Sequence, residues 1–252
     1  MRIDWRAAVF YVPRDPQWQA RIGVGGLLLL LLPPVGWLGA LGYRSLVVNR
    51  LVDGIAPRLP PWRGTFVRAL GRGAASSGII LLYLAPFFVL YWLLGVRSSA
   101  SLSNHWREIA SFAAAVIVFP PLGLPVLPIA YAVWYDWLHF TAAEVSLLVL
   151  LFVGPIFVAP AGFLQVADRR RFLAALDLPA AFALIFAVPR LYLEAWIGAL
   201  GVSALSVAIV PLAPWLLFWS YLVISHLFLQ VLAASGRCRT TAAARWQEVM
   251  SP

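Results

Sequence analysis

Long segments without a charged side chain are the feature that most constrains this chain. Four such intervals of 22 to 27 residues lie between Arg21 and Arg44, Arg72 and Arg97, Glu108 and Asp136, and Glu144 and Asp168. A fifth, between Glu194 and Arg237, holds 42 residues and is broken near Pro211 and Pro214. A helix needs about 20 apolar residues to cross the hydrocarbon core of a bilayer. The first four intervals therefore predict one crossing helix each, and the fifth predicts two.

Composition supports the same class. Hydrophobic residues make up 62% of the chain and charged residues only 12%, whereas a soluble domain carries about 25% charged residues. The intervals also lack the alternation expected of transmembrane β-strands. We therefore expect an all-α integral membrane protein with about six transmembrane helices, interfacial amphipathic helices and proline-broken segments, in the inner (cytoplasmic) membrane of a bacterium.

The charges divide the chain into three regions. We expect an N-terminal interfacial arm over residues 1–21, a polytopic membrane domain over 22–236 and a polar tail over 237–252. Two connections, 43–77 and 168–190, are rich in arginine and carry amphipathic or short apolar pieces, which favours a position in the membrane interface. Their similar layout suggests two repeat halves, 22–96 and 145–234.

The arginines leave two topologies open. All 19 basic residues are arginines, and the net charge is +9. Six plain crossings place 13 of them on the side of both termini, which the positive-inside rule assigns to the cytoplasm, but leave six on the other side. If the first and third intervals instead dip and return, at Pro33-Pro34 and at residues 119–125, the division becomes 17 to 2. Because the arginines border apolar runs, they favour contact with membrane lipids and exclude a nucleic-acid surface.

A few polar residues lie inside the predicted spans. His226 and Gln230 are one helical turn apart, with Tyr221 and Ser225 on the same part of the helix, so the four form a candidate intramembrane polar cluster. We expect hydrogen bonds between helices here, with pigment or haem ligation by His226 or His139 as the alternative.

Three shorter patterns predict local structure. Arg190 and Glu194 have the spacing of an ion pair within a helix. The small residues Ala195, Ala199 and Ser203 predict close helix packing. Thr141 and Glu144 form the capping-box pattern that starts a helix.

No pattern of catalytic or metal-binding residues is present. The three histidines are far apart, Cys238 is the only cysteine, and neither a phosphate loop nor a nucleophile elbow occurs. We therefore expect no enzyme activity and no cofactor. The leading hypothesis is a scaffold or accessory subunit that packs against other membrane protein subunits. A transporter or handler of a lipid or small solute, and a pigment- or haem-associated subunit, are the alternatives.

The order of several short motifs resembles a known family. The motif residues are Gly36, Trp37, Gly42, Tyr43, Leu59, Pro60, Trp62, Tyr83 and Pro86, and a second group ends the last span with Ser225, His226 and Gln230. This order is similar to that of the membrane family called domain of unknown function 4013. The family often has acidic residues after its Leu-Pro-x-Trp motif, where this chain has Arg63 and Gly64. The resemblance implies a helical membrane fold and no particular activity.

Overall fold

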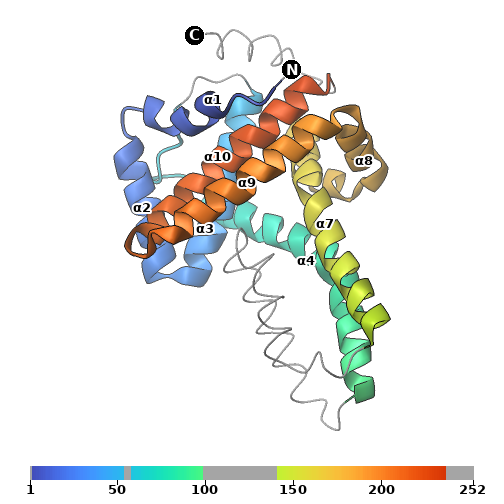
Figure 1. Cartoon of the computed structure of the whole chain (residues 1–252). Coiled ribbons are helices and arrows are strands. Elements are labelled where there is room, and N and C mark those ends of the chain that lie inside the picture. Colours follow the sequence, from blue (N-terminus) through green and yellow to red (C-terminus); the bar gives the residue numbers. More distant parts are fainter. Residues whose placement is uncertain (1, 54–57, 99–140, 237–252) are drawn as a thin grey trace. The chain divides into compact units, whose positions relative to one another are not determined.

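All regular secondary structure in the described part of the chain is helical. The structure is a computed structural model, and it describes residues 2–53, 58–98 and 141–236 (Figure 1). The α-helices are α1 (Trp5–Phe10), α2 (Trp18–Leu31), α3 (Pro33–Val52), α4 (Phe66–Ser98), α7 (Ala142–Arg169), α8 (Leu178–Ala187), α9 (Pro189–Ala208) and α10 (Ala213–Ala234). Three short 3-10 helices join them: η1 (Val12–Arg14), η3 (Phe172–Leu176) and η4 (Val210–Leu212). The predicted all-α class is confirmed for these residues.

The chain forms two compact units. Unit 1 comprises Met1–Ser76 and Pro160–Pro252, and unit 2 comprises Ser77–Ala159. In unit 2, α4 and α7 contact each other through Phe87 and Phe152, whose ring centroids are 5.2 Å apart. The predicted capping box at the start of α7 is confirmed: the Thr141 N–H donates to Glu144 Oε2 at 2.8 Å, and the Glu144 N–H donates to Thr141 Oγ1 at 3.3 Å.

Helix α10 is the central element of unit 1. Its residues from 217 to 232 are almost all buried, and it packs against α1, α2, α3 and α9 (Figure 1). Antiparallel α9 lies along it, with Tyr192 and Trp196 edge-on to the ring of Phe228. The predicted small-residue stripe is confirmed, because Ala195, Ala199 and Ser203 are all buried. The break predicted near Pro211 is also confirmed, as η4 separates the two helices.

The first charge-free interval contains two helices, and the prediction of one helix there was wrong. Helix α2 ends at Leu31, and α3 begins at Pro33, in the first turn where proline costs no hydrogen bond. The two helices form a hairpin. Arg21 near the start of α2 and Arg50 near the end of α3 bind the neighbouring carbonyls of Leu59 and Arg58. The open ends of the hairpin therefore lie together.

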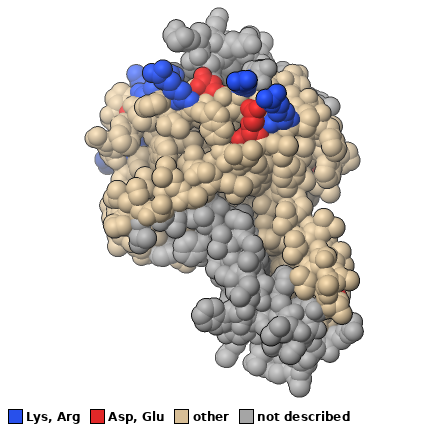
Figure 2. All heavy atoms as spheres, in the orientation of Figure 1, with Lys and Arg blue, Asp and Glu red and all other residues tan. Residues whose placement is uncertain are grey.

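Helices α9 and α10 form a second hairpin, and the N-terminal arm binds the open ends of both the α2–α3 and the α9–α10 hairpin. Its Ile3 N–H donates to Glu194 near the start of α9, at 3.4 Å, and its Asp4 binds Gln230 near the end of α10. Farther along the arm, Asp15 binds Arg21 of α2. Charged side chains on the visible face gather mainly along the edge that carries α1 (Figure 2).

Three of the described helices are long and apolar enough to cross a membrane. They are α4 over Phe66–Leu94, α7 and α10. Helices α8 and α9, bent by 97° at Val188, add a fourth candidate if they count as one span. Six crossings are therefore not established. The third predicted span and the break at residues 119–125 lie outside the described residues.

The short apolar piece at 178–189 is helix α8, capped by Asp177. The Asp177 carboxylate accepts the Ala180 N–H at 3.1 Å and pairs with Arg169 at 2.7 Å. The Arg169 guanidinium, with the helix N–H, holds the pKa of this carboxyl below its usual value. The cap fixes where the chain turns from α7 into α8.

Candidate functional site

The extended segment Leu59-Pro60-Pro61 lies at the centre of the first candidate site. Its two prolines have no N–H, so the segment cannot form the regular backbone hydrogen bonds of a helix or a sheet. Leu59 is nevertheless only 1% exposed. Buried backbone groups require partners, because an unsatisfied group loses its hydrogen bonds to water without replacement. In this protein the partners are side chains from three separate parts of the sequence.

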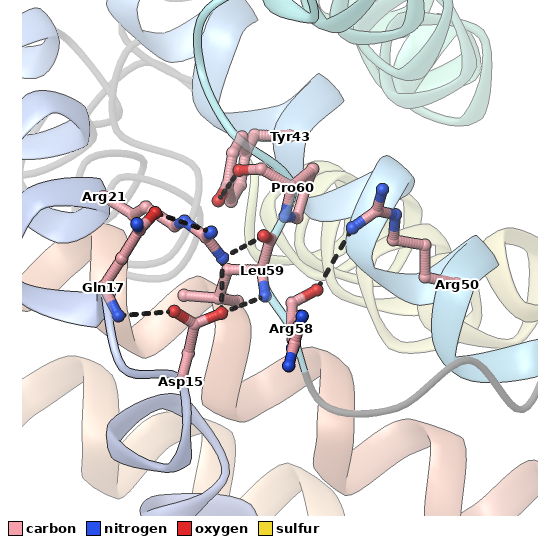
Figure 3. Close-up of polar contacts among 8 residues, drawn as sticks. All are labelled: Asp15, Gln17, Arg21, Tyr43, Arg50, Arg58, Leu59 and Pro60. Atoms are coloured by element: carbon pink, nitrogen blue, oxygen red, sulfur yellow. Dashed lines mark hydrogen bonds and ion pairs between the residues drawn. The ribbon is translucent and has the colours of Figure 1, made fainter.

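Asp15 and Arg21 together bind both backbone groups of Leu59 (Figure 3). Asp15 Oδ2 accepts the Leu59 N–H at 2.7 Å, and Arg21 Nη1 donates to the Leu59 carbonyl. The same Nη1 forms an ion pair with Asp15 Oδ2. The second carboxylate oxygen accepts the Gln17 N–H at 2.7 Å. The Asp15 side chain is 1% exposed and that of Arg21 is 14% exposed, so this pair is shielded from solvent.

The carbonyls on either side of Leu59 are also bound (Figure 3). Arg50 Nη1 donates to the Arg58 carbonyl at 3.2 Å, and the Tyr43 hydroxyl donates to the Pro60 carbonyl at 2.6 Å. Three successive carbonyls, from residues 58 to 60, thus accept hydrogen bonds from α2 and α3. We call Asp15, Arg21, Tyr43 and Trp62 the Leu59 clamp.

Aromatic packing completes the Leu59 clamp. The rings of Tyr43 and Trp62 are stacked with centroids 4.4 Å apart, and both lie within 5.6 Å of the Phe218 ring of α10. The Trp62 indole N–H donates to the Arg21 carbonyl at 2.9 Å. The clamp therefore joins α2, α3, α10 and the extended segment in one buried cluster.

The structure brings most of the family-motif residues into this region. Tyr43, Leu59, Pro60 and Trp62 touch directly, as described above. Gly36 faces the Leu28 backbone across the α2–α3 hairpin, and Trp37 lies edge-on to Tyr221 at 5.4 Å. Gly42 faces the start of α4. Tyr83 and Pro86 lie on α4 in unit 2, where Tyr83 is 8% exposed.

A second site binds the N-terminal arm to α10. The Asp4 N–H donates to Gln230 Oε1 at 2.7 Å, and Gln230 Nε2 donates to the Asp4 carbonyl at 2.9 Å. One amide side chain thus binds both backbone groups of one residue, as Asp15 and Arg21 do for Leu59. Gln230 Nε2 is also 3.2 Å from His226 Nδ1. Because the amide nitrogen can only donate, Nδ1 accepts in this contact.

The other members of the predicted polar cluster do not converge on His226. The His226 ring is 3% exposed and lies 5.3 Å from the Tyr11 ring of the arm. Burial, aided by the charge of Asp15, raises the pKa of Tyr11. Ser225 donates to the carbonyl of Tyr221 in its own helix at 2.7 Å. The Tyr221 hydroxyl is buried and has no hydrogen-bond partner among the described residues.

The remaining predicted site residues have separate positions. Arg190 Nε lies 3.1 Å from Glu194 Oε1, and the other oxygen of Glu194 accepts the Ile3 N–H. His139 lies outside the described residues. In α3, the Arg44 guanidinium lies over the Phe163 ring at 4.9 Å, a cation–π contact. Arg44 forms no ion pair with a carboxylate within the described residues.

Sequence reasoning did not identify Asp15 and Arg21, although they form the most buried ion pair that the structure describes. In the sequence, Arg21 only marks the border of an apolar run, and no motif contains Asp15. Their common partner is the backbone of Leu59, which has no signature in the sequence.

Both sites hold backbone in place. The Asp15 carboxylate, the Arg21 guanidinium and the Gln230 amide all bind main-chain partners. No group of three or more His, Cys, Asp or Glu side chains that could hold a metal occurs within the described ranges.

Comparison with known proteins identifies one family. The sequence profile of the family described as protein of unknown function DUF4013 matches residues 25–219. No curated protein and no solved structure matches the chain. Because the match covers most of the chain, this protein belongs to the DUF4013 family, as the motif order predicts.

Proposed function

We propose that this DUF4013 protein is a non-enzymatic membrane protein that acts as a scaffold or accessory subunit, packing against other membrane components. The observation that carries this proposal is what the polar groups of the N-terminal arm and of the helix ends bind. Gln230, Glu194 and the Asp15–Arg21 pair bind the protein's own backbone. A catalytic or transport site needs polar groups that converge on a space for substrate. Here they bind backbone instead, and they stabilise a helical domain with exposed apolar side chains.

The proposed topology starts from the shared side of the helix ends. The open ends of the α2–α3 and α9–α10 hairpins both bind the N-terminal arm, which supports placing them on the same membrane side. Helix α2 has 14 residues and is therefore about 21 Å long. The hydrocarbon core is about 30 Å thick. We propose that α2 and α3 enter the membrane and return without crossing it.

Helices α4 and α7 then cross in opposite directions. Arg170, just after α7, binds Asp53 and the Asn49 carbonyl at the end of α3. The end of α7 is thus on the side where α3 ends, so α4 leaves that side and α7 returns to it. This arrangement places 17 arginines on one side and two, Arg97 and Arg107, on the other. By the positive-inside rule the arginine-rich side faces the cytoplasm of a bacterial cell.

Cysteine labelling tests this topology. In a Cys238→Ser background, we expect an Arg63→Cys variant to react with a membrane-impermeant maleimide only after the membrane is permeabilised. An otherwise identical Leu212→Cys variant, at the 52% exposed tip of the α9–α10 hairpin, should react in intact cells. Labelling of Arg63→Cys from outside would exclude the returning α2–α3 hairpin.

Two apolar surfaces of unit 1 are suited to contact neighbouring membrane components. On α9, Leu193, Ile197 and Leu200 are 52%, 69% and 48% exposed and share one helical face. On α8, the stacked rings of Phe182 and Phe186 are 43% and 73% exposed. These surfaces contact either lipid or another protein.

Site-specific photocrosslinking in the native membrane tests the scaffold proposal. A photoreactive phenylalanine analogue at Ile197 or Phe186 should give a discrete product heavier than the 27.7 kDa monomer. The same analogue at Phe228, which is 4% exposed, is the matched control and should give none. Crosslinks to lipid alone, together with a monomeric mass after gentle detergent extraction, would contradict the proposal.

A further inference from the structure

Two helix ends in unit 1 place arginines near one another. Arg68 and Arg72 are one turn apart near the start of α4, and Arg170 follows the end of α7. Among the described residues, the cations Arg68 and Arg170 lie close enough to Arg72 to interact with it electrostatically. Close approach of α3 and α4 holds this end together, because Gly42 faces Ala69 and Gly73 faces Leu38.

Arg170 is fixed in position by α3. Its Nη2 donates to the Asn49 carbonyl at 3.1 Å and pairs with Asp53. Its backbone has a φ of 57°, in the left-handed region that a non-glycine residue seldom adopts. The Arg170–Asp53 pair thus fixes the position of a cation that interacts with Arg72.

Arg72 has an enclosed donor without an acceptor. Its Nη1 atom is buried and has no hydrogen-bond partner in the described part of the chain. A buried donor on a cation is costly unless an acceptor reaches it. The protein therefore provides a half-buried guanidinium at Arg72, two further cations nearby, and no carboxylate bound to Arg72 among the described residues.

We propose that Arg72, with Arg68 and Arg170, binds the phosphate of an anionic phospholipid headgroup. A guanidinium presents two parallel N–H donors that match phosphate oxygens, and three cations suit an anion with several oxygens. The cluster lies within the first two turns of α4 and at the end of α7, where the bordering arginines of a membrane protein meet headgroups. This site goes beyond the proposed scaffold function and does not depend on it.

Lipid titration of the purified full-length protein tests the site. In neutral detergent after delipidation, added phosphatidylglycerol should raise the Tm, whereas phosphatidylcholine should not. Arg72→Gln should increase the half-saturating phosphatidylglycerol concentration about fivefold, the effect expected for one arginine near an anionic surface. Arg63→Gln removes an exposed arginine from the same connection and should behave like the unmodified protein.

Two further measurements distinguish a lipid phosphate from a soluble phosphate and replace a variant that does not fold. Inorganic phosphate that reproduces the full Tm increase would identify a soluble phosphate as the ligand of the same site. If Arg72→Gln does not fold, Arg68→Gln replaces it, because Arg68 is exposed and removing its charge leaves the packing intact. An unchanged phosphatidylglycerol response in the variant that folds, or an equal response to phosphatidylcholine, would overturn the proposal.

Discussion

Replacing Asp15 with asparagine is expected to lower the free energy of unfolding by about 3–5 kcal/mol, the usual cost of breaking a buried ion pair. Asp15 is 1% exposed, and its two oxygens accept hydrogen bonds from Gln17, Leu59 and Arg21. An asparagine amide keeps only one acceptor oxygen. Its NH₂ group would face N–H donors of the neighbours and could not accept a hydrogen bond from them. Arg21 also loses its counterion while it remains largely enclosed.

The matched control for this prediction is Asp53→Asn. Asp53 also pairs with an arginine, but the Asp53 and Arg170 side chains are 48% and 40% exposed. An exposed pair contributes only about 0–1 kcal/mol. Equilibrium unfolding in detergent, followed by circular dichroism, compares the two variants. Equal losses for Asp15→Asn and Asp53→Asn would mean that the Leu59 clamp does not stabilise the fold through its buried charges.

A double-mutant cycle separates the ion pair from the other bonds of the clamp. Arg21→Gln removes the counterion and weakens the bond to the Leu59 carbonyl. If the Asp15–Arg21 interaction matters as a pair, the double variant should lose clearly less stability than the sum of the two single losses. Additive losses would assign the stabilisation to separate contacts with the Leu59 backbone.

The parts of the fold that depend on local sequence could be predicted. A charge-free run such as the one that forms α7 has to be a helix in lipid, because only a helix satisfies all its backbone groups internally. Thr141 and Glu144 start that helix through contacts within one turn. The break between α9 and α10 follows from prolines at fixed positions. None of these inferences needs a distant partner.

The turn between α2 and α3 shows where local reasoning fails. A proline pair at 33 and 34 fits a kink in one crossing helix as well as a hairpin. The hairpin is decided by contacts outside the interval: Arg21 and Arg50 bind neighbouring carbonyls of the 58–60 segment. Hydropathy carries no information about such partners, so the number of crossings could not be derived from the sequence.

The sequence predicted where the polar residues of α10 lie but not which groups they bind. The four-residue spacing predicted that His226 and Gln230 share a helical face, and their side chains lie 3.2 Å apart. The main partner of Gln230 is the backbone of Asp4, 226 residues away in the sequence. Every residue has an N–H or a carbonyl, so a backbone partner leaves no trace in a motif. For this reason the sequence did not predict that the N-terminal arm binds α10.

The family-motif glycine at position 42 is expected to be the least replaceable glycine of α3. A Cβ atom at Gly42 would overlap the Ala69 carbonyl oxygen and would lie 2.7 Å from the Gly73 nitrogen. Both contacts are with the backbone of α4, which cannot move aside as a side chain can. Gly42→Ala therefore forces α3 and α4 apart, and we expect a loss of about 3 kcal/mol, the upper end of the usual cost of overpacking.

Gly71→Ala provides a control of opposite sign on the partner helix. A Cβ atom at Gly71 meets nothing within 4 Å, so alanine there should stabilise α4 by about 0.5–1 kcal/mol through its higher helix propensity. The same unfolding measurement compares the two variants. A neutral or stabilising Gly42→Ala would show that α3 and α4 do not cross in close contact.

The crossing also affects the Leu59 clamp, which gives Gly42→Ala a second expected consequence. Tyr43 follows Gly42 directly and donates to Pro60, while Trp62 stacks on Tyr43 a few residues before α4 begins. Separating the two helices therefore pulls Tyr43 away from the segment that it binds. In Gly42→Ala the added loss caused by Asp15→Asn should be smaller than in the unmodified chain, because the clamp is already weakened. Full additivity would instead place the helix crossing and the clamp in independent parts of unit 1.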